Sequence, residues 1–116
     1  MPIFSIVITS FNRIHALKRA IKSCLDQSFK SFEIIVVDDC SSDGTKSFLQ
    51  NLDSNKIKFY FHKKNKGVVS SRHTGSKLCR GSWIINLDSD HTLHPNVLES
   101  LNSKIIVIAL LDESLR

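Results

Sequence analysis

Short apolar runs alternate with segments of helical spacing along the chain, and this alternation restricts the fold more than any other feature. Four runs rich in β-branched and aromatic residues have the length and composition of buried strands. They are Phe4–Thr9, Phe32–Val37, Ile57–Phe61 and Trp83–Leu87. Because these runs are continuously apolar, they are typical of a parallel sheet that is covered on both faces. The sequence therefore predicts an α/β domain of three α/β/α layers with a mostly parallel sheet.

Helices are predicted between the strands. The apolar residues from Ile14 to Leu25 follow helical spacing, and Ser10 or Asn12 can cap that helix. Three further helices are expected: one after Asp43, one over Val68–Cys79 and one beginning near Pro95. The run Ile105–Leu110 is interpreted as a last strand or as a buried piece of helix. We expect Trp83 in the core and the two histidines His15 and His62 at the surface.

Length and charge restrict the function only broadly. The 116 residues fit one domain, and the formal net charge of +5 suits an anionic ligand, an acidic membrane surface or a nucleic acid. The basic residues are spread along the chain, which disfavours a nucleic-acid-binding face. The three cysteines form no C-x-x-C pair, so free or buried thiols are expected. The longest apolar run, Ile105–Leu111, is too short to span a bilayer, so we expect a soluble protein or one peripheral to a membrane.

Polar clusters follow three of the predicted strands. They are Thr9-Ser10-Phe11-Asn12, Asp38-Asp39 and Asp88-Ser89-Asp90. The carboxyl ends of parallel strands meet at one edge of a sheet, where ligands of such folds bind. The sequence therefore predicts that the three clusters form one site.

Each cluster has a chemical interpretation and a purely structural one. Asp88 and Asp90 could hold Mg²⁺ or Mn²⁺ against phosphates, with His91 as a further ligand, or form a solvated turn. The pair Asp38-Asp39 could accept hydrogen bonds from a base or a ribose, or cap the next turn. In the first cluster Thr9 and Asn12 could offer polar groups to a base, and Phe11 could offer a ring for stacking. Alternatively, these residues cap the next helix and pack in the core. Arg72 is the best candidate among the basic residues to face a diphosphate.

The residues in these positions resemble a known family. The stretch FSIVITSFNRIHALKRAIKSCLDQSFKSFEIIVVDDCSSDGT, followed by NKGVVSSRHTGSKLCRGSWIINLDSDH, resembles the start of inverting family 2 glycosyltransferases, which have the Rossmann-like GT-A fold. The likeness runs from about Ile3 to Leu101 in the family's order and spacing. It implies transfer of a sugar from a nucleotide-diphosphate sugar to an acceptor hydroxyl. The expected donor is a UDP-sugar.

The resemblance also implies roles for individual residues. Thr9, Phe11 and Asn12 would line the nucleotide, and Asp39 would bind the uracil with support from Asp38. Arg72 would lie near the diphosphate or the base pocket, and Asp88 by the ribose or the metal. Asp90 would be the direct ligand of Mn²⁺ or Mg²⁺. Three residues depart from the family pattern: Cys40 replaces a glycine, His73 an asparagine, and His91 an aspartate.

The resemblance covers only the donor-binding part of the family's catalytic domain. We therefore expect residues 1–116 to form one nucleotide-sugar-binding domain that lacks the acceptor-binding half and the general base, which stays unassigned. The alternatives are a truncated or non-catalytic nucleotide-binding module of the same family, and a nucleotidyltransferase, which TSFNR after the first strand disfavours. The expected partners are a nucleotide-diphosphate sugar and a glycan or lipid-linked acceptor. The expected location is the cytoplasm or the inner face of a membrane, with self-association through exposed apolar surface.

Overall fold

The computed structural model describes residues 1–114, and the side chains of residues 1–106. These residues form four strands and four helices in strict alternation. The strands are β1 (Phe4–Ser10), β2 (Phe32–Asp38), β3 (Ile57–Phe61) and β4 (Trp83–Asp88), and the helices are α1 (Ile14–Leu25), α2 (Thr45–Gln50), α3 (Val68–Leu78) and α4 (Val97–Ser114).

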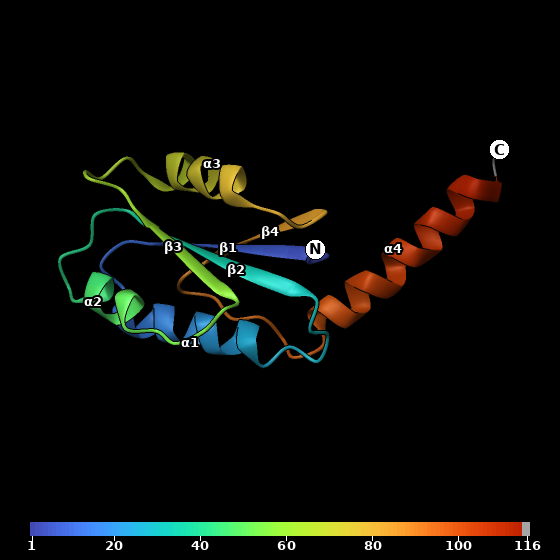
Figure 1. Ribbon diagram of the computed structural model, residues 1–116, viewed down its shortest axis with the longest axis horizontal. Helices are drawn as coiled ribbons and strands as arrows, with labels where there is room; N and C mark the ends of the chain where they lie inside the picture. Colours follow the sequence, from blue (N-terminus) through green and yellow to red (C-terminus); the bar gives the residue numbers. More distant parts are fainter. Residues whose placement is uncertain (115–116) are drawn as a thin grey trace.

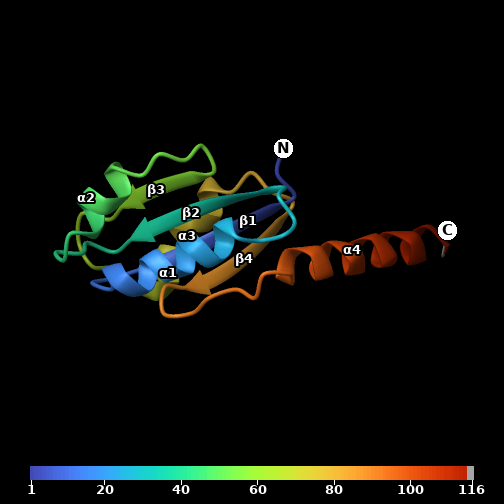
Figure 2. The ribbon, with the colours of Figure 1, turned by 90° about the horizontal axis from the view of Figure 1, so that it is seen from below.

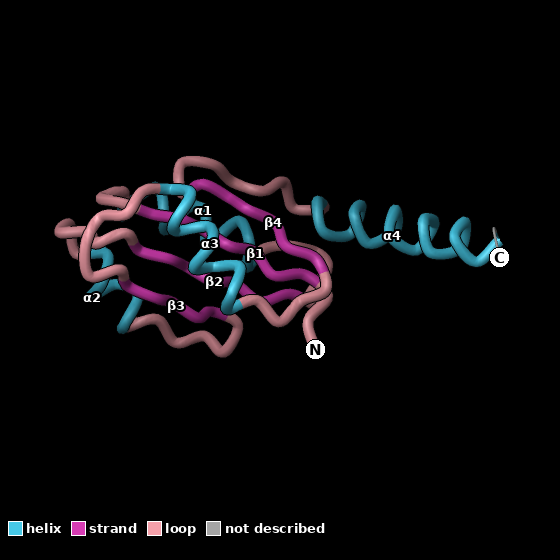
Figure 3. Tube along the Cα trace, turned by 90° about the horizontal axis from the view of Figure 1, so that it is seen from above, coloured by secondary structure: helices cyan, strands magenta, loops and turns pink. Residues whose placement is uncertain are grey.

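The strands form one sheet in the order β3-β2-β1-β4, and every pairing is parallel. Helix α3 lies on one face of the sheet, and α1 and α2 lie on the other (Figure 1). Figure 3 shows the strands side by side in the sheet. The predicted α/β/α fold with a parallel sheet is therefore confirmed.

The register of the sheet aligns the carboxyl ends of β1, β2 and β4. Ser10 pairs with Asp38 of β2, and Thr9 pairs with Asp88 of β4. The polar residues that follow these three strands therefore begin at one edge of the sheet, as the sequence predicts.

The main core lies between the sheet and α1. Four helix residues at helical spacing, Leu17, Ala20, Ile21 and Cys24, are buried against alternate residues of the strands. The buried strand residues on this face are Phe4, Ile6, Ile8, Phe32, Ile34, Val36, Ile57 and Leu87. Burial of these apolar side chains stabilises the contact between α1 and the sheet.

The opposite face accepts α3 through small residues. Ser71 and Gly75 are the buried residues of this helix. A Cβ atom at Gly75 would lie 2.4 Å from Val7 Cγ1, so only glycine allows the helix to approach the sheet this closely. This packing explains why α3 has a weak apolar pattern in the sequence.

The interpretation of Ile105–Leu110 as a last strand is wrong, because these residues lie inside α4. No glycine or proline separates them from the start of that helix, so the helix continues through them. The first turn packs on the domain: Leu98 is buried, and its N–H donates to Gln27 Oε1 at 3.1 Å. Beyond it α4 runs away from the sheet (Figure 2), and Ile106 is 53% exposed. Among the described residues no helix combines the length and apolar character needed to cross a membrane.

Two further expectations about burial are wrong. Trp83 is 48% exposed, because β4 pairs with β1 alone among the described residues and its first residues lie at the rim of the sheet. His62 is buried rather than at the surface. It directly follows the last residue of β3, and its ring contacts Asp39 and Thr74 of α3.

Candidate nucleotide and metal site

A pocket of about 350 Å³ opens at the carboxyl edge of the sheet. It is lined by residues at or just after the ends of β1, β2 and β4 and by residues from the first turn of α3. Its lining residues are Thr9, Ser10, Phe11, Arg13, Asp39, Val68, Ser71, Asp88, Ser89 and Asp90. The volume lies in the range of small-ligand sites. Five predicted site residues line it: Thr9, Phe11, Asp39, Asp88 and Asp90.

Asn12 and Asp38 do not line the pocket but hold its loops. Asn12 has φ 50°, and its Oδ1 accepts a hydrogen bond from Ser42 N at 2.8 Å. Asn12 N donates to Ser41 Oγ at 2.8 Å, and both the N–H and the hydroxyl of Ser41 donate to the buried Asp38 carboxylate. These bonds join the loop after β1 to the loop after β2.

Cys40, which stands where the resembling family has glycine, adopts a left-handed backbone conformation. Its φ is 69°, in the left-handed region that non-glycine residues rarely adopt. The exposed thiol is 3.5 Å from the Lys63 carbonyl oxygen. The backbone course of the loop is therefore compatible with cysteine, at some conformational cost.

Asp39 lies at the back of the pocket and is 4% exposed. Its Oδ1 accepts from Lys66 N at 2.9 Å and lies 2.8 Å from His62 Nδ1, and its Oδ2 accepts from Gly67 N at 2.8 Å. Burial raises the pKa of Asp39, but the hydrogen bonds from His62, Lys66 and Gly67 outweigh it and hold the pKa below its ordinary value. Asp39 is therefore a carboxylate at neutral pH.

Asp88 is oriented by two neighbours at the end of β4. Its Oδ1 accepts from Arg72 Nη2 at 3.0 Å and from Thr9 Oγ1 at 3.4 Å. Arg72 thus reaches the site through Asp88 rather than by lining the pocket itself. The buried Arg72 Nε has no hydrogen-bond partner among the described residues.

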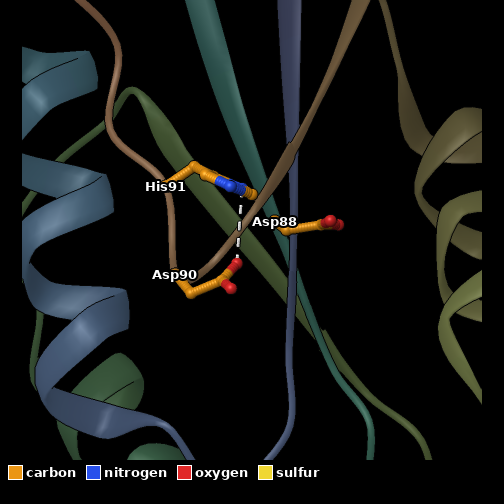
Figure 4. A group of neighbouring side chains, drawn as sticks. All are labelled: Asp88, Asp90 and His91. Carbon is orange, nitrogen blue, oxygen red and sulfur yellow. Dashed lines mark ion pairs between the residues drawn. The ribbon is translucent and has the colours of Figure 1, made fainter.

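The donor set after β4 fits a divalent cation. One ligand atom each from Asp88, Asp90 and His91 lies within 4.8 Å of the others. Figure 4 shows the three side chains, with the Asp90 carboxylate facing the His91 ring, whose Nδ1 lies 3.3 Å from Asp90 Oδ1. Asp90 and His91 are exposed and Asp88 is half-buried, so an ion held by them would keep open positions for oxygen atoms of a ligand.

Several pocket residues were not predicted. Ser10 and Ser89 belong to the predicted polar clusters but were given no role of their own, and Arg13 directly follows the first cluster. The Ser10 hydroxyl is buried and finds no hydrogen-bond partner among the described residues. A buried hydroxyl without a protein partner at a pocket wall is free to bond a polar ligand group or a water molecule. Val68 and Ser71 belong to the first turn of α3, and no local pattern marks them.

Comparison with known proteins places these observations in a family. Residues 5–106 match the family described as "Glycosyl transferase family 2". A GalNAc(5)-diNAcBac-PP-undecaprenol beta-1,3-glucosyltransferase of Campylobacter jejuni is 40% identical over 107 residues, which are 90% of this chain and 35% of that protein. A chondroitin synthase of Escherichia coli is 37% identical over 100 residues, which are 85% of this chain and 15% of that one. The chain thus spans about a third of the first relative's length and about a seventh of the second's.

Solved structures agree with the fold. S. aureus TarS 1-349 in complex with UDP-GlcNAc superposes with a TM-score of 0.80 at 27% identity, over 89% of this chain and 30% of that one. A mannosyltransferase of Pyrobaculum calidifontis, solved with GDP-Man and Mn²⁺, has a TM-score of 0.71 at 18% identity, over 78% of this chain and 28% of that one. The second likeness concerns the fold alone.

Proposed function

The chain belongs to glycosyl transferase family 2, and on this premise we propose that residues 1–116 form a domain that binds a nucleotide-diphosphate sugar, with a UDP-sugar as the donor. The observation that carries the proposal is the pocket at the carboxyl edge of the sheet. There a buried carboxylate (Asp39), an aromatic ring (Phe11) and a buried hydroxyl (Ser10) that has no partner among the described residues meet the acidic end of β4. The UDP-GlcNAc complex of the structurally similar TarS supports the choice of donor.

Different lining residues bind different parts of the nucleotide. Phe11 is half-exposed beside the pocket and offers its face for stacking on the base. Asp39 accepts a hydrogen bond from the base, and Ser10 Oγ bonds the ribose or a phosphate. Thr9 and Arg72 hold Asp88 toward the diphosphate end.

Asp88, Asp90 and His91 would hold Mn²⁺ or Mg²⁺, which would supply positive charge to stabilise the departing nucleoside diphosphate. Asp90 lines the pocket and His91 follows it in the chain; both are exposed, so ligand oxygens can reach them. The general base that deprotonates the acceptor is assigned to none of the described residues.

The decisive experiment is a calorimetric titration of the protein with UDP, with and without Mn²⁺. We expect saturable binding that Mn²⁺ strengthens, and loss of the Mn²⁺ effect in Asp90→Asn. Asp53→Asn is the matched control, because Asp53 is exposed and lies outside the pocket. If the folded protein fails to bind UDP with Mn²⁺ present, the proposal is wrong.

We also propose that the complete reaction transfers the sugar to a glycan or lipid-linked acceptor at the inner face of a membrane. The name of the Campylobacter relative includes an undecaprenyl diphosphate acceptor, which supports this choice. The runner-up is a module that binds the nucleotide and transfers nothing. The two are separated by supplying a lipid-linked glycan with UDP-glucose: release of UDP that depends on the acceptor favours the transferase.

The rim of the sheet at β4 supports a proposal of self-association. Trp83 and Ile84 are each nearly half exposed on a strand that pairs with β1 alone among the described residues. An open strand with apolar side chains is prone to pair with another chain. Sedimentation velocity across a concentration series is expected to show association that Ile84→Ser reduces, and a concentration-independent monomer contradicts it.

A further inference from the structure

A buried histidine links three parts of the fold beneath the nucleotide pocket. His62 follows β3, is 5% exposed, and donates its backbone N–H to the Asp38 carbonyl at 2.9 Å. Its ring lies between Asp39 and α3: Nδ1 is 2.8 Å from Asp39 Oδ1, and Nε2 is 2.8 Å from Thr74 Oγ1. The ring thus joins the pocket carboxylate to the helix that covers the sheet.

The carboxylate fixes the direction of the first of these hydrogen bonds, and the protonation of the ring fixes the direction of the second. An ionised carboxylate has no proton to give, so His62 Nδ1–H is the donor to Asp39. The Nε2 atom of a neutral ring then accepts the hydroxyl proton of Thr74. Loss of either bond would leave a buried polar group without a partner, which is costly.

The hydrogen bonds of Asp39 restrict how it can meet a ligand. A carboxylate has about four acceptor sites. Among the described residues three donors use them: His62 and Lys66 N on Oδ1, and Gly67 N on Oδ2. The remaining acceptor site is on Asp39 Oδ2, and Asp39 lines the pocket. Asp39 can therefore accept one more hydrogen bond, from a ligand N–H at a defined position.

We propose that His62 is a positioning residue that holds Asp39 so that its last acceptor site selects a base with a ring N–H. This inference rests on the proposed nucleotide binding. Uracil presents N3–H, whereas cytosine presents a bare N3 acceptor at the same place, which a fixed carboxylate repels. Since UDP and CDP share the ribose and the diphosphate, the ratio of their dissociation constants isolates the contact with Asp39.

The test compares UDP and CDP titrations, both with Mn²⁺, for the wild type and two variants. His62→Phe keeps an aromatic ring but removes both ring hydrogen bonds, and His62→Asn keeps a donor near the position of Nδ1. For the wild type we expect preference for UDP by roughly tenfold or more. His62→Phe is expected to lose most of that preference, and His62→Asn to recover much of it.

The outcomes separate the two proposals. If the wild type binds neither nucleotide, the proposed function fails. If the wild type prefers UDP and a folded His62→Phe weakens both nucleotides by the same factor, His62 has only a structural role and the inference is overturned. Should His62→Phe not fold, Thr74→Val replaces it, because valine removes only the hydroxyl that orients the ring. We then expect the preference to fall about threefold or more, and an unchanged preference overturns the inference.

Discussion

Asp43 Oδ2 accepts a hydrogen bond from the backbone N–H of Ile14 at 3.0 Å, so a residue of the loop after β2 caps the helix that follows β1. The other carboxylate oxygen accepts from the N–H and the hydroxyl of Thr45, at 3.2 and 2.6 Å, at the start of α2. One side chain therefore satisfies backbone donors at the first turns of two helices. Neither helix has a cap from its own N-cap side chain.

Asp43→Ala is expected to lower the free energy of unfolding by about 1–2 kcal/mol, the usual cost of losing a helix cap. It removes acceptors from α1 and α2 together, so the value should lie toward the upper end of that range. Chemical denaturation followed by far-UV circular dichroism measures it. Asp53→Ala, at an exposed position of the next loop, serves as the control and should change stability little. Equal stability of the two variants would contradict the double-cap interpretation.

His91→Ala is expected to change which metal ion best supports UDP binding, while the affinity for UDP in the presence of Mg²⁺ changes little. Carboxylate oxygens suit Mg²⁺, whereas an imidazole nitrogen favours ions such as Co²⁺ and Ni²⁺. Loss of the His91 ring should therefore weaken binding supported by Co²⁺ more than about tenfold and binding supported by Mg²⁺ only slightly. Titrations with UDP and each metal in turn measure the two effects.

His94→Ala is the control for His91, because His94 is also exposed but takes no part in the Asp88–Asp90–His91 group. A uniform loss across all metals in His91→Ala would show that His91 acts on the loop rather than on the ion.

The sheet and the site edge could be predicted from sequence because local patterns specify them. Each strand is a short β-branched run, and the polar clusters follow directly in the chain, so parallel pairing alone brings Thr9, Asp39 and Asp88 together. The roles of Asn12 and Asp38 are different. Asp38 caps the turn that follows it through Ser41, which is one of the two roles that the sequence suggests, whereas Asn12 bonds Ser42 across two loops that are distant in the sequence.

The burial of His62 and the exposure of Trp83 could not be predicted from local pattern either. A histidine beside three lysines resembles a surface turn, and only the placement of α3 and Asp39 provides two hydrogen-bond partners for the ring. A tryptophan in an apolar run resembles core, but burial depends on which strand lies at the rim of the sheet. Both outcomes are set by tertiary arrangement rather than by residue type.

Gly75→Ala is expected to destabilise the fold by about 1–3 kcal/mol, although alanine is the better helix former. The added Cβ would lie 2.4 Å from Val7 Cγ1 and 3.4 Å from Val37 Cγ2, so α3 must move away from the sheet. Ser76→Ala on the exposed side of the same helix is the control. In the Val7→Ala background the same glycine change should cost less, because the atom it meets is gone. An additive double-mutant cycle would refute the steric explanation.

Glu33 is expected to contribute to the acid sensitivity of the fold. This buried carboxylate accepts from Ser5 Oγ at 2.6 Å and Arg80 N at 2.6 Å, and pairs with Lys58 Nζ at 3.1 Å. Burial raises the pKa of Glu33, but the bonds from Ser5 and Arg80 and the charge of Lys58 outweigh it, so the pKa lies below its ordinary value of 4.5. The folded state therefore binds the proton less readily than the unfolded state.

The stability that Glu33 supplies is thus fully present above about pH 5 and is lost as the pH falls through 4.5 toward the lowered folded pKa. Glu33→Gln should lower the free energy of unfolding at pH 7 by about 1–3 kcal/mol. The variant should also lose less stability than the wild type between pH 6 and pH 3. Urea titrations at both pH values measure the difference, and the remaining carboxylates cancel because both proteins contain them. Parallel pH curves for the two proteins would show that Glu33 titrates alike in the folded and unfolded states.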